Sequence, residues 1–261
     1  MITVNNKEQF TFFSFPGGER HCKLANDHTL VEGSCVSIRG VLKNPSDIIE
    51  LLLVVDAVRR ESCFVDLLKI HYFPYAQQDR INDLGESLTS KIMADLINSL
   101  DVPRVDVFDP HSDVVPALLN NCRVIDNTSF ICDAAHQFKP DFLIVPDNGA
   151  KRRVEACAAV LHLPLAYCDK RRDAKTGALT GFKLVSDVPG GSRGMIVDDI
   201  CVGGGTFLGM ADLFDVDLAL AVSHGVFSNG TSILLEKFKS VYTTDSFYNK
   251  QEEGVGVYKI R

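Results

Sequence analysis

The sequence predicts an α/β protein made of two similar domains, each a parallel β-sheet flanked by helices. Two observations lead to this prediction. Apolar runs of strand length alternate with longer segments whose apolar residues recur at helical spacing, and the alternation occurs twice along the 261 residues. A chain of this length suits two domains of ordinary size. The halves meet near residues 126–135, so we expect an N-terminal domain of residues 1–128 and a C-terminal domain of residues 129–261.

The elements of the first half follow from apolar spacing. Residues 45–60 carry Ile48, Leu52 and Val55 at helical spacing, and residues 64–72 form a largely apolar run of strand length. In chain order, we expect a strand at 34–38, a helix at 45–60, a strand at 64–72, a helix at 88–100 and a strand at 105–108.

The second half repeats the pattern. In chain order, we expect a strand at 141–145, a helix at 153–161, and strands at 164–168 and 195–197, followed by a helix at 206–214 and a strand at 217–222. Residues 170–194 differ, because they are charged and glycine-rich. We expect them to form a mobile flap.

Composition narrows the functional classes. The formal net charge of -7 argues against general affinity for nucleic acid. The eight cysteines include no C-x-x-C pair, which is typical of buried free thiols in a reducing cytosol. We find neither a signal peptide nor an apolar run long enough to cross a bilayer. The sequence therefore predicts a soluble, cytoplasmic protein without a nucleic-acid or membrane partner.

The most informative segment is residues 194–206. A short apolar run ends in Asp198 and Asp199, and Gly203, Gly204, Gly205 and Thr206 follow. Glycines let backbone N–H groups approach phosphate oxygens closely, and paired carboxylates can hold ribose hydroxyls or a hydrated metal ion. The segment predicts a site for a phosphorylated sugar, although a plain strand, turn and helix start is the alternative.

Four other strands are also followed by polar residues, and ligands of open α/β sheets bind at such strand ends. These clusters are residues 75–80, 109–113, 146–149 and 169–172. Each has a structural alternative: His111 as a hydrogen-bonded histidine, Asp147 as a turn residue and residues 170–172 as a solvated run. Together, the five clusters favour magnesium-assisted transfer of a phosphoryl-type group, which depends on positioning and charge neutralisation.

Six or seven segments, in order from residue 15 to residue 228, resemble motifs of the ribose-phosphate pyrophosphokinase family. The pairs are residues 15–19 with F-S-D-G-E, 72–80 with P-Y-F-x-Y-A-R-Q-D-R, 109–111 with D-L-H, 145–149 with S-P-D-x-G-G, 169–172 with D-K-R-R, 197–206 with V-D-D-x-x-D-T-x-G-T and 224–228 with T-H-G-x-F-S. The resemblance implies phosphoribosyltransferase-like domains. It also implies transfer of the β,γ-diphosphoryl group of ATP, as a Mg²⁺ complex, to the anomeric hydroxyl of ribose 5-phosphate, with release of AMP.

The resemblance also implies a role for each matching residue. Lys170 and Arg172 would be catalytic and neutralise the transferring group, while His111 and Asp147 would hold magnesium-bound phosphate or ribose. The residues implied to bind ATP are Phe15, Glu19, Gln78, Asp79 and His111. Asp198 and Asp199 would hold the ribose hydroxyls, and the residues implied to bind the 5-phosphate are Gly203, Gly204, Gly205 and Thr206. Phe15 and Glu19 would help to form an adenine site, which a homo-oligomer, dimer or larger, could build across a subunit interface.

Departures from the family pattern keep alternatives open. Gln77 stands where the pattern has arginine, Gly17 where it has an acid, and Val202-Gly203 where it has D-T. A glycine-rich loop suggests room for a larger acceptor such as ADP-ribose, which we weigh equally with ribose 5-phosphate. We also expect the family's first strand and helix and its last helix to have no counterpart in this sequence. A non-catalytic regulatory relative and a phosphoribosyltransferase remain as alternatives.

Overall fold

The structure, a computed structural model, describes residues 1–172 and 179–260. The chain divides into two compact units, Met1–Asp126 and Asn127–Arg261, so the division falls two residues before the expected boundary. Both units are α/β, and most strand pairs in their main sheets are parallel. The predicted fold class is confirmed.

The first unit contains a five-stranded sheet in the order β1-β4-β5-β6-β7 and a separate two-stranded hairpin, β2-β3. Only β1 runs antiparallel to its neighbour in the five-stranded sheet. The bounds are β1 (Ile2–Val4), β2 (Phe10–Ser14), β3 (Arg20–Leu24), β4 (Cys35–Val41), α1 (Pro45–Arg60), β5 (Phe64–Tyr72), α2 (Thr89–Asn98), β6 (Val105–Phe108), α3 (Val114–Leu118) and β7 (Cys122–Ile125).

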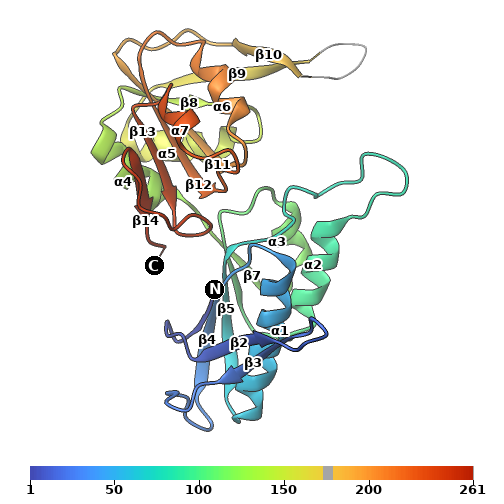
Figure 1. The fold of residues 1–261 in the computed structure, drawn as a ribbon. Helices are drawn as coiled ribbons and strands as arrows, with labels where there is room; N and C mark the ends of the chain where they lie inside the picture. Colours follow the sequence, from blue (N-terminus) through green and yellow to red (C-terminus); the bar gives the residue numbers. More distant parts are fainter. Residues whose placement is uncertain (173–178, 261) are drawn as a thin grey trace. The chain divides into compact units, whose positions relative to one another are not determined.

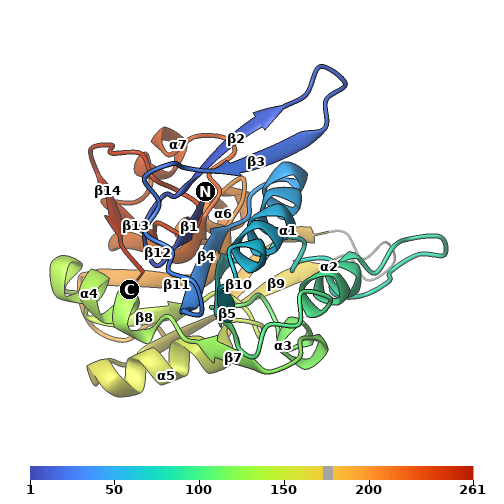
Figure 2. The same cartoon turned by 90° about the horizontal axis from the view of Figure 1, so that it is seen from below.

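The helices of the first unit share one core with its sheet. Leu51 of α1, Met93 of α2 and Val115 of α3 are buried in the same cluster as Ile38 and Leu68 of the strands. The three helices lie on the same side of the sheet (Figures 1 and 2). This arrangement leaves the polar loops after β5 and β6 at the carboxyl ends of neighbouring parallel strands.

The start of α1 shows why its bounds were readable from sequence. The Asn44 side chain accepts hydrogen bonds from the backbone N–H groups of Ser46 and Asp47, and the Asp47 carboxylate accepts one from the Asn44 N–H. This reciprocal capping satisfies donors that a helix start leaves without partners. Pro45, whose fixed φ suits the first helical position, completes the signal.

The second unit has a seven-stranded sheet in the order β10-β9-β8-β11-β12-β13-β14, parallel except for β10. The bounds are α4 (Thr128–Phe138), β8 (Phe142–Val145), α5 (Lys151–Leu161), β9 (Leu165–Arg172), β10 (Leu179–Leu184), β11 (Arg193–Cys201), α6 (Gly205–Ala211), β12 (Asp217–Gly225), α7 (Ser232–Leu235), β13 (Ser240–Thr244) and β14 (Val255–Tyr258).

This sheet is covered on both faces. Alternate residues of β11 enter different cores: Ile196 packs in the cluster that contains α6 and α7, and Val197 in the cluster that contains α4 and α5. Figure 2 shows α4 and α5 on one side of the sheet and α6 and α7 on the other. Because both faces of the sheet are covered, β11 is apolar on both of its faces over residues 195–197, and Asp198 and Asp199 follow before the strand ends at Cys201.

The cysteines are all free thiols, and Cys35 at the start of β4 is the exposed one among the eight. Burial raises the pKa of Cys168 to about 11, and burial with the nearby Asp198 charge raises the pKa of Cys201 to about 12. These two thiols are therefore protonated and unreactive at neutral pH. No helix in the described ranges is long and apolar enough to cross a membrane.

Candidate active site

The carboxyl end of β11 carries a nearly buried acidic pair. The side chains of Asp198 and Asp199 are 16% and 6% exposed, and the Arg153 guanidinium lies 3.9 Å from the first and 3.8 Å from the second. Burial, and then the adjacent Asp199 carboxylate, hold the pKa of Asp198 well above its usual value. Because the charged form of Asp198 is disfavoured here, a ligand that brings hydroxyl donors or a cation would stabilise it.

Asp147 lies close enough to Asp198 for its charge to add to this effect. Its Oδ1 accepts hydrogen bonds from the N–H groups of Gly149 (2.9 Å) and Ala150 (3.2 Å) at the entry to α5. Asp147 is therefore a turn residue, which was the structural alternative for it. The same turn holds the Asp147 carboxylate at the end of β8, beside the strand that bears the acidic pair.

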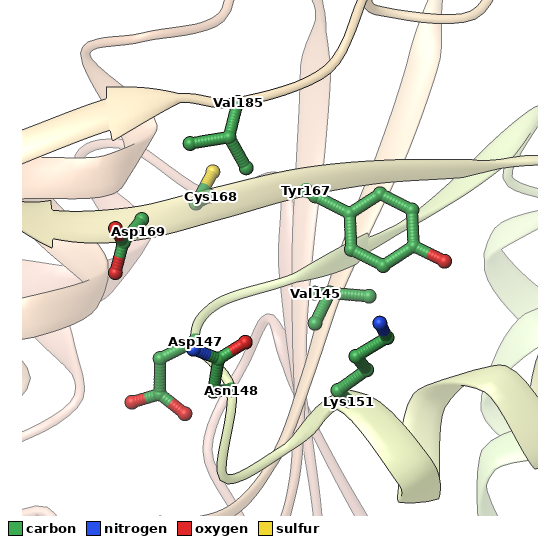
Figure 3. A pocket seen from close by; sticks show the side chains of 8 residues that line it. All are labelled: Val145, Asp147, Asn148, Lys151, Tyr167, Cys168, Asp169 and Val185. Atoms are coloured by element: carbon green, nitrogen blue, oxygen red, sulfur yellow. The ribbon is translucent and has the colours of Figure 1, made fainter.

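A cavity of about 300 Å³ opens at the ends of β8 and β9. Figure 3 shows the side chains that line it: Val145, Asp147, Asn148, Lys151, Tyr167, Cys168, Asp169 and Val185. Lys151 lies with its ammonium 5.8 Å from the centre of the Tyr167 ring, and the Tyr167 hydroxyl donates to Glu155. Lys183 pairs with Asp169 at 3.4 Å. The cavity thus combines an apolar wall with charges of both signs.

The glycine loop joins β11 to α6. Gly204 has φ +85°, and a Cβ there would lie 2.8 Å from a Leu234 methyl, so this position requires glycine. A Cβ at Gly205 would meet no atom within 4 Å. The Asn229 amide donates a hydrogen bond of 3.0 Å to the Gly203 carbonyl. The loop is thus held from the side at Gly203 and open at Gly205.

In the first unit, the loops after β5 and β6 bring Asp79 and His111 together. The Asp79 carboxylate is 3% exposed and pairs with Arg80 at 3.0 Å. Burial pushes the pKa of Asp79 up, but hydrogen bonds from Arg80 and Ser112 and the nearby His111 hold that pKa below its usual value. Asp79 is therefore ionised at neutral pH, and much of its charge is already matched. Gln78 is exposed beside it, and its backbone N–H donates to Tyr75.

Phe15 and Glu19 close the loop of the β2-β3 hairpin, where the Phe15 N–H donates to the Glu19 carbonyl at 2.9 Å. The Phe15 ring is 47% exposed and lies 5.5 Å from both the Phe13 and the His21 ring centres. An exposed aromatic cluster on a hairpin suits stacking against a planar ring.

Lys170 and Arg172 lie in the last part of β9, paired with Phe182 and Leu179 of β10. The expectation of a flap at 170–194 is corrected: the end of β9 and all of β10 lie within this range, because the two strands pair antiparallel. The side chains of residues 170–180, and residues 173–178 altogether, lie outside the described part of the chain. The roles assigned to Lys170 and Arg172 stay predictions.

Sequence reasoning missed two side chains at this site. Arg153, in the first turn of α5, contacts both aspartates, and a basic residue soon after a strand-end carboxylate was the available signal. Asn229 reaches Gly203 across 26 residues of chain, and nothing local in the sequence indicates that contact.

Comparisons with known proteins find a matching family model and similar sequences. Residues 7–100 match the model of the N-terminal domain of ribose phosphate pyrophosphokinase. The ribose-phosphate pyrophosphokinase of Cereibacter sphaeroides is 32% identical over 232 residues, which cover 83% of this chain and 68% of the relative. That of Mycoplasma pneumoniae is 34% identical over 233 residues, which cover 84% and 68%.

A solved structure shares the fold. The phosphoribosylpyrophosphate synthetase of Mycobacterium smegmatis superposes with a TM-score of 0.79 at 24% identity, covering 96% of this chain and 85% of that one. The chain spans about two thirds of the length of several curated relatives, with shares of 68%, 65% and 65%. On these matches, the chain belongs to the ribose-phosphate pyrophosphokinase family of transferases.

Proposed function

We propose that the protein transfers the β,γ-diphosphoryl group of Mg-ATP to the anomeric hydroxyl of a ribose 5-phosphate moiety. The acceptor oxygen forms a bond to the β-phosphorus and loses its proton to water, while the bond from that phosphorus to the α–β bridging oxygen breaks and AMP leaves. The observation that carries the proposal is the acidic pair Asp198-Asp199, which lies beside Arg153 and three residues before the glycine loop.

The acceptor half of the site is assigned to the second unit. Asp198 and Asp199 would accept hydrogen bonds from the ribose hydroxyls, which would stabilise the charged form of Asp198 that burial otherwise disfavours. The backbone N–H groups of residues 203–206 would bind the 5-phosphate. Lys170 and Arg172, which follow Asp169 on β9, would neutralise charge on the transferring group.

The donor half is assigned to Phe15, Glu19, Gln78, Asp79 and His111. The Phe15 ring offers a stacking surface for adenine, and the exposed position of the hairpin loop favours a homo-oligomer, dimer or larger, in which the loop reaches a neighbouring copy. Glycine at position 17 leaves Glu19 as the acidic residue of this loop. Asp79 positions the loop that carries Gln78.

The residues fit Mg²⁺ that arrives with ATP. Among the described residues, no group of three or more His, Cys, Asp or Glu side chains is arranged as a metal cage. Mg²⁺ in phosphoryl-transfer sites is bound by one or two protein ligands, substrate phosphates and water, so a complete protein cage is not required. His111 in the first unit and Asp147 in the second are each suited to supply such a ligand, and the ion would neutralise charge on the phosphates.

The acceptor is either ribose 5-phosphate or a 5-extended form such as ADP-ribose, which keeps a free anomeric hydroxyl. Open space at Gly205 supports the larger acceptor, whereas the Asn229 amide fills part of the room beside Gly203. Both acceptors should therefore be tested side by side.

The test is a product analysis by mass spectrometry. Purified protein with Mg-ATP and either acceptor should yield AMP and the 1-diphosphate of the acceptor that reacts. Asp199→Asn should abolish the product, while Asp212→Asn, at an exposed aspartate that pairs with Lys237, should leave it unchanged. Absence of AMP with both acceptors would overturn the proposal and favour a regulatory relative, to which Gln77 and Gly17 point. Consumption of the 1-diphosphate with a nucleobase would indicate a phosphoribosyltransferase.

A further inference from the structure

The segment after β12 lies along one side of the glycine loop. Beyond the last paired residues of β11 and β12, the backbone N–H of Val226 donates to Cys201 at 2.9 Å, and the N–H of Ser228 donates to Val202 at 2.8 Å. These bonds extend the contact between the two strands past their ends. They place the side chains of Ser228 and Asn229, both exposed, next to Val202 and Gly203.

Asn229 lies close to the point where a side chain at position 203 would begin. A Cβ built on Gly203 would lie 3.1 Å from the Asn229 amide nitrogen, closer than ordinary contact, and 3.7 Å from the Ser228 hydroxyl oxygen. The motif that this segment resembles has threonine at this position, with a side-chain donor of its own. In this chain a donor is present at the same place, but it is supplied by a residue 26 positions further along.

The residues that flank Asn229 are held by several contacts. The buried Thr231 hydroxyl donates to the Glu252 carboxylate, and the Phe227 ring packs edge-on against Tyr248 at 5.1 Å. Gly230 closes a turn by donating to the Phe227 carbonyl at 2.9 Å. Asn229 is therefore carried on a braced turn. Its amide nitrogen uses one N–H for Gly203 and carries a second.

We infer that Asn229 is a specificity-determining residue of the acceptor site, whose amide replaces the side-chain donor missing at Gly203 and contacts the 5-phosphate ester of the acceptor. The inference rests on the proposed function, because it assigns the glycine loop to the acceptor phosphate. It predicts that positions 203 and 229 are interchangeable: one side-chain donor must be present, and two would crowd each other.

A double-mutant cycle tests this exchange. Asn229→Ala should raise KM for the reacting acceptor about 10-fold, the effect of one hydrogen bond to a charged group, with little change in KM for ATP. Gly203→Thr should also raise it, because its Cβ crowds the Asn229 amide. The double variant Asn229→Ala with Gly203→Thr should recover to within about 3-fold of wild type, since the new hydroxyl enters the vacated space. Asn229→Asp keeps the size but cannot donate and adds a negative charge, so it should be at least as impaired as Asn229→Ala.

Controls separate the possible failures. Asn120→Ala, at an exposed asparagine of the first unit, should match wild type, and thermal unfolding should show that each variant is folded. If the double variant is unfolded, Asn229→Asp and Asn229→Ala still decide through the split between the two KM values. Additive or worse losses in a folded double variant, or equal rises in both KM values, would overturn the inference while leaving the proposed function intact. A wild-type protein that forms no AMP with either acceptor would overturn both.

Discussion

Replacing Gly204 by alanine should destabilise the second unit far more than the same change at the adjacent Gly205. At position 204 the backbone has φ +85°, where a side chain costs about 1–2 kcal/mol. The new Cβ would also lie 2.8 Å from a Leu234 methyl, and crowding of this kind costs about 1–3 kcal/mol. Alanine also lowers the conformational entropy of the unfolded chain, which offsets this destabilisation by about 0.4–1 kcal/mol. The net loss for Gly204→Ala is therefore about 1–5 kcal/mol, with a central value of about 3 kcal/mol.

Gly205 supplies the matched control. It is the first residue of α6, its φ is not in the left-handed region, and a Cβ there meets no atom within 4 Å. Gly205→Ala should therefore leave the free energy of unfolding unchanged or raise it by up to about 1 kcal/mol. Urea unfolding followed by far-UV circular dichroism would measure both variants, with the slope checked for constancy. Equal unfolding free energies for the two variants, within about 0.5 kcal/mol, would refute the assignment of Gly204 as an obligate glycine.

Three further predictions concern two buried carboxylates and one lysine. Asp198→Asn should stabilise the ligand-free second unit by about 1–3 kcal/mol at neutral pH. The folded-state pKa of Asp198 is raised, so wild-type stability should fall as pH rises from the usual aspartate range through that pKa, and urea titrations across pH should lose this slope in the variant. Asp106, 4% exposed, pairs with the half-exposed Arg104 and Arg123, so Asp106→Asn should cost about 1–3 kcal/mol. Hydrogen bonds from these arginines hold the pKa of Asp106 low despite its burial. The stability advantage of wild type over Asp106→Asn should therefore vanish as pH falls through that lowered pKa. An unchanged difference in unfolding free energy at acidic pH would contradict this prediction. Lys170→Ala should lower kcat about 100-fold or more while changing the Kd for ATP far less, and losses of equal size would count against its action on the transition state.

The sequence predicted best those elements whose signals are local. The bounds of α1 and β5 agree with expectation, because the capping group at Asn44 and the apolar run at 64–72 each act over a few residues. The helix α4 was missed, although Phe130, Ile131 and Ala134 are spaced for burial on one face, because its segment was interpreted as the junction of the halves. The strands β9 and β11 continue past their expected ends, since pairing with β10 and β12 overrides the polar residues there.

In the candidate site, too, local signals were readable from the sequence and long-range contacts were not. The motifs located Asp147, Asp198 and the glycine loop, because each lies at the end of a predicted strand. Arg153 and Asn229 could not be paired with their partners from sequence, since those contacts depend on how β8, β11 and β12 are ordered in the sheet.

The distribution of thiols makes the native chain suitable for site-selective labelling. Cys35 is exposed, whereas burial suppresses the thiolate of Cys168 and Cys201. A maleimide fluorophore at limiting concentration should therefore attach first at Cys35, without removal of the other cysteines. Since Cys35 opens β4 in the first unit, a second probe placed by substitution in the other unit would allow the distance between the units to be followed by energy transfer as nucleotide is added.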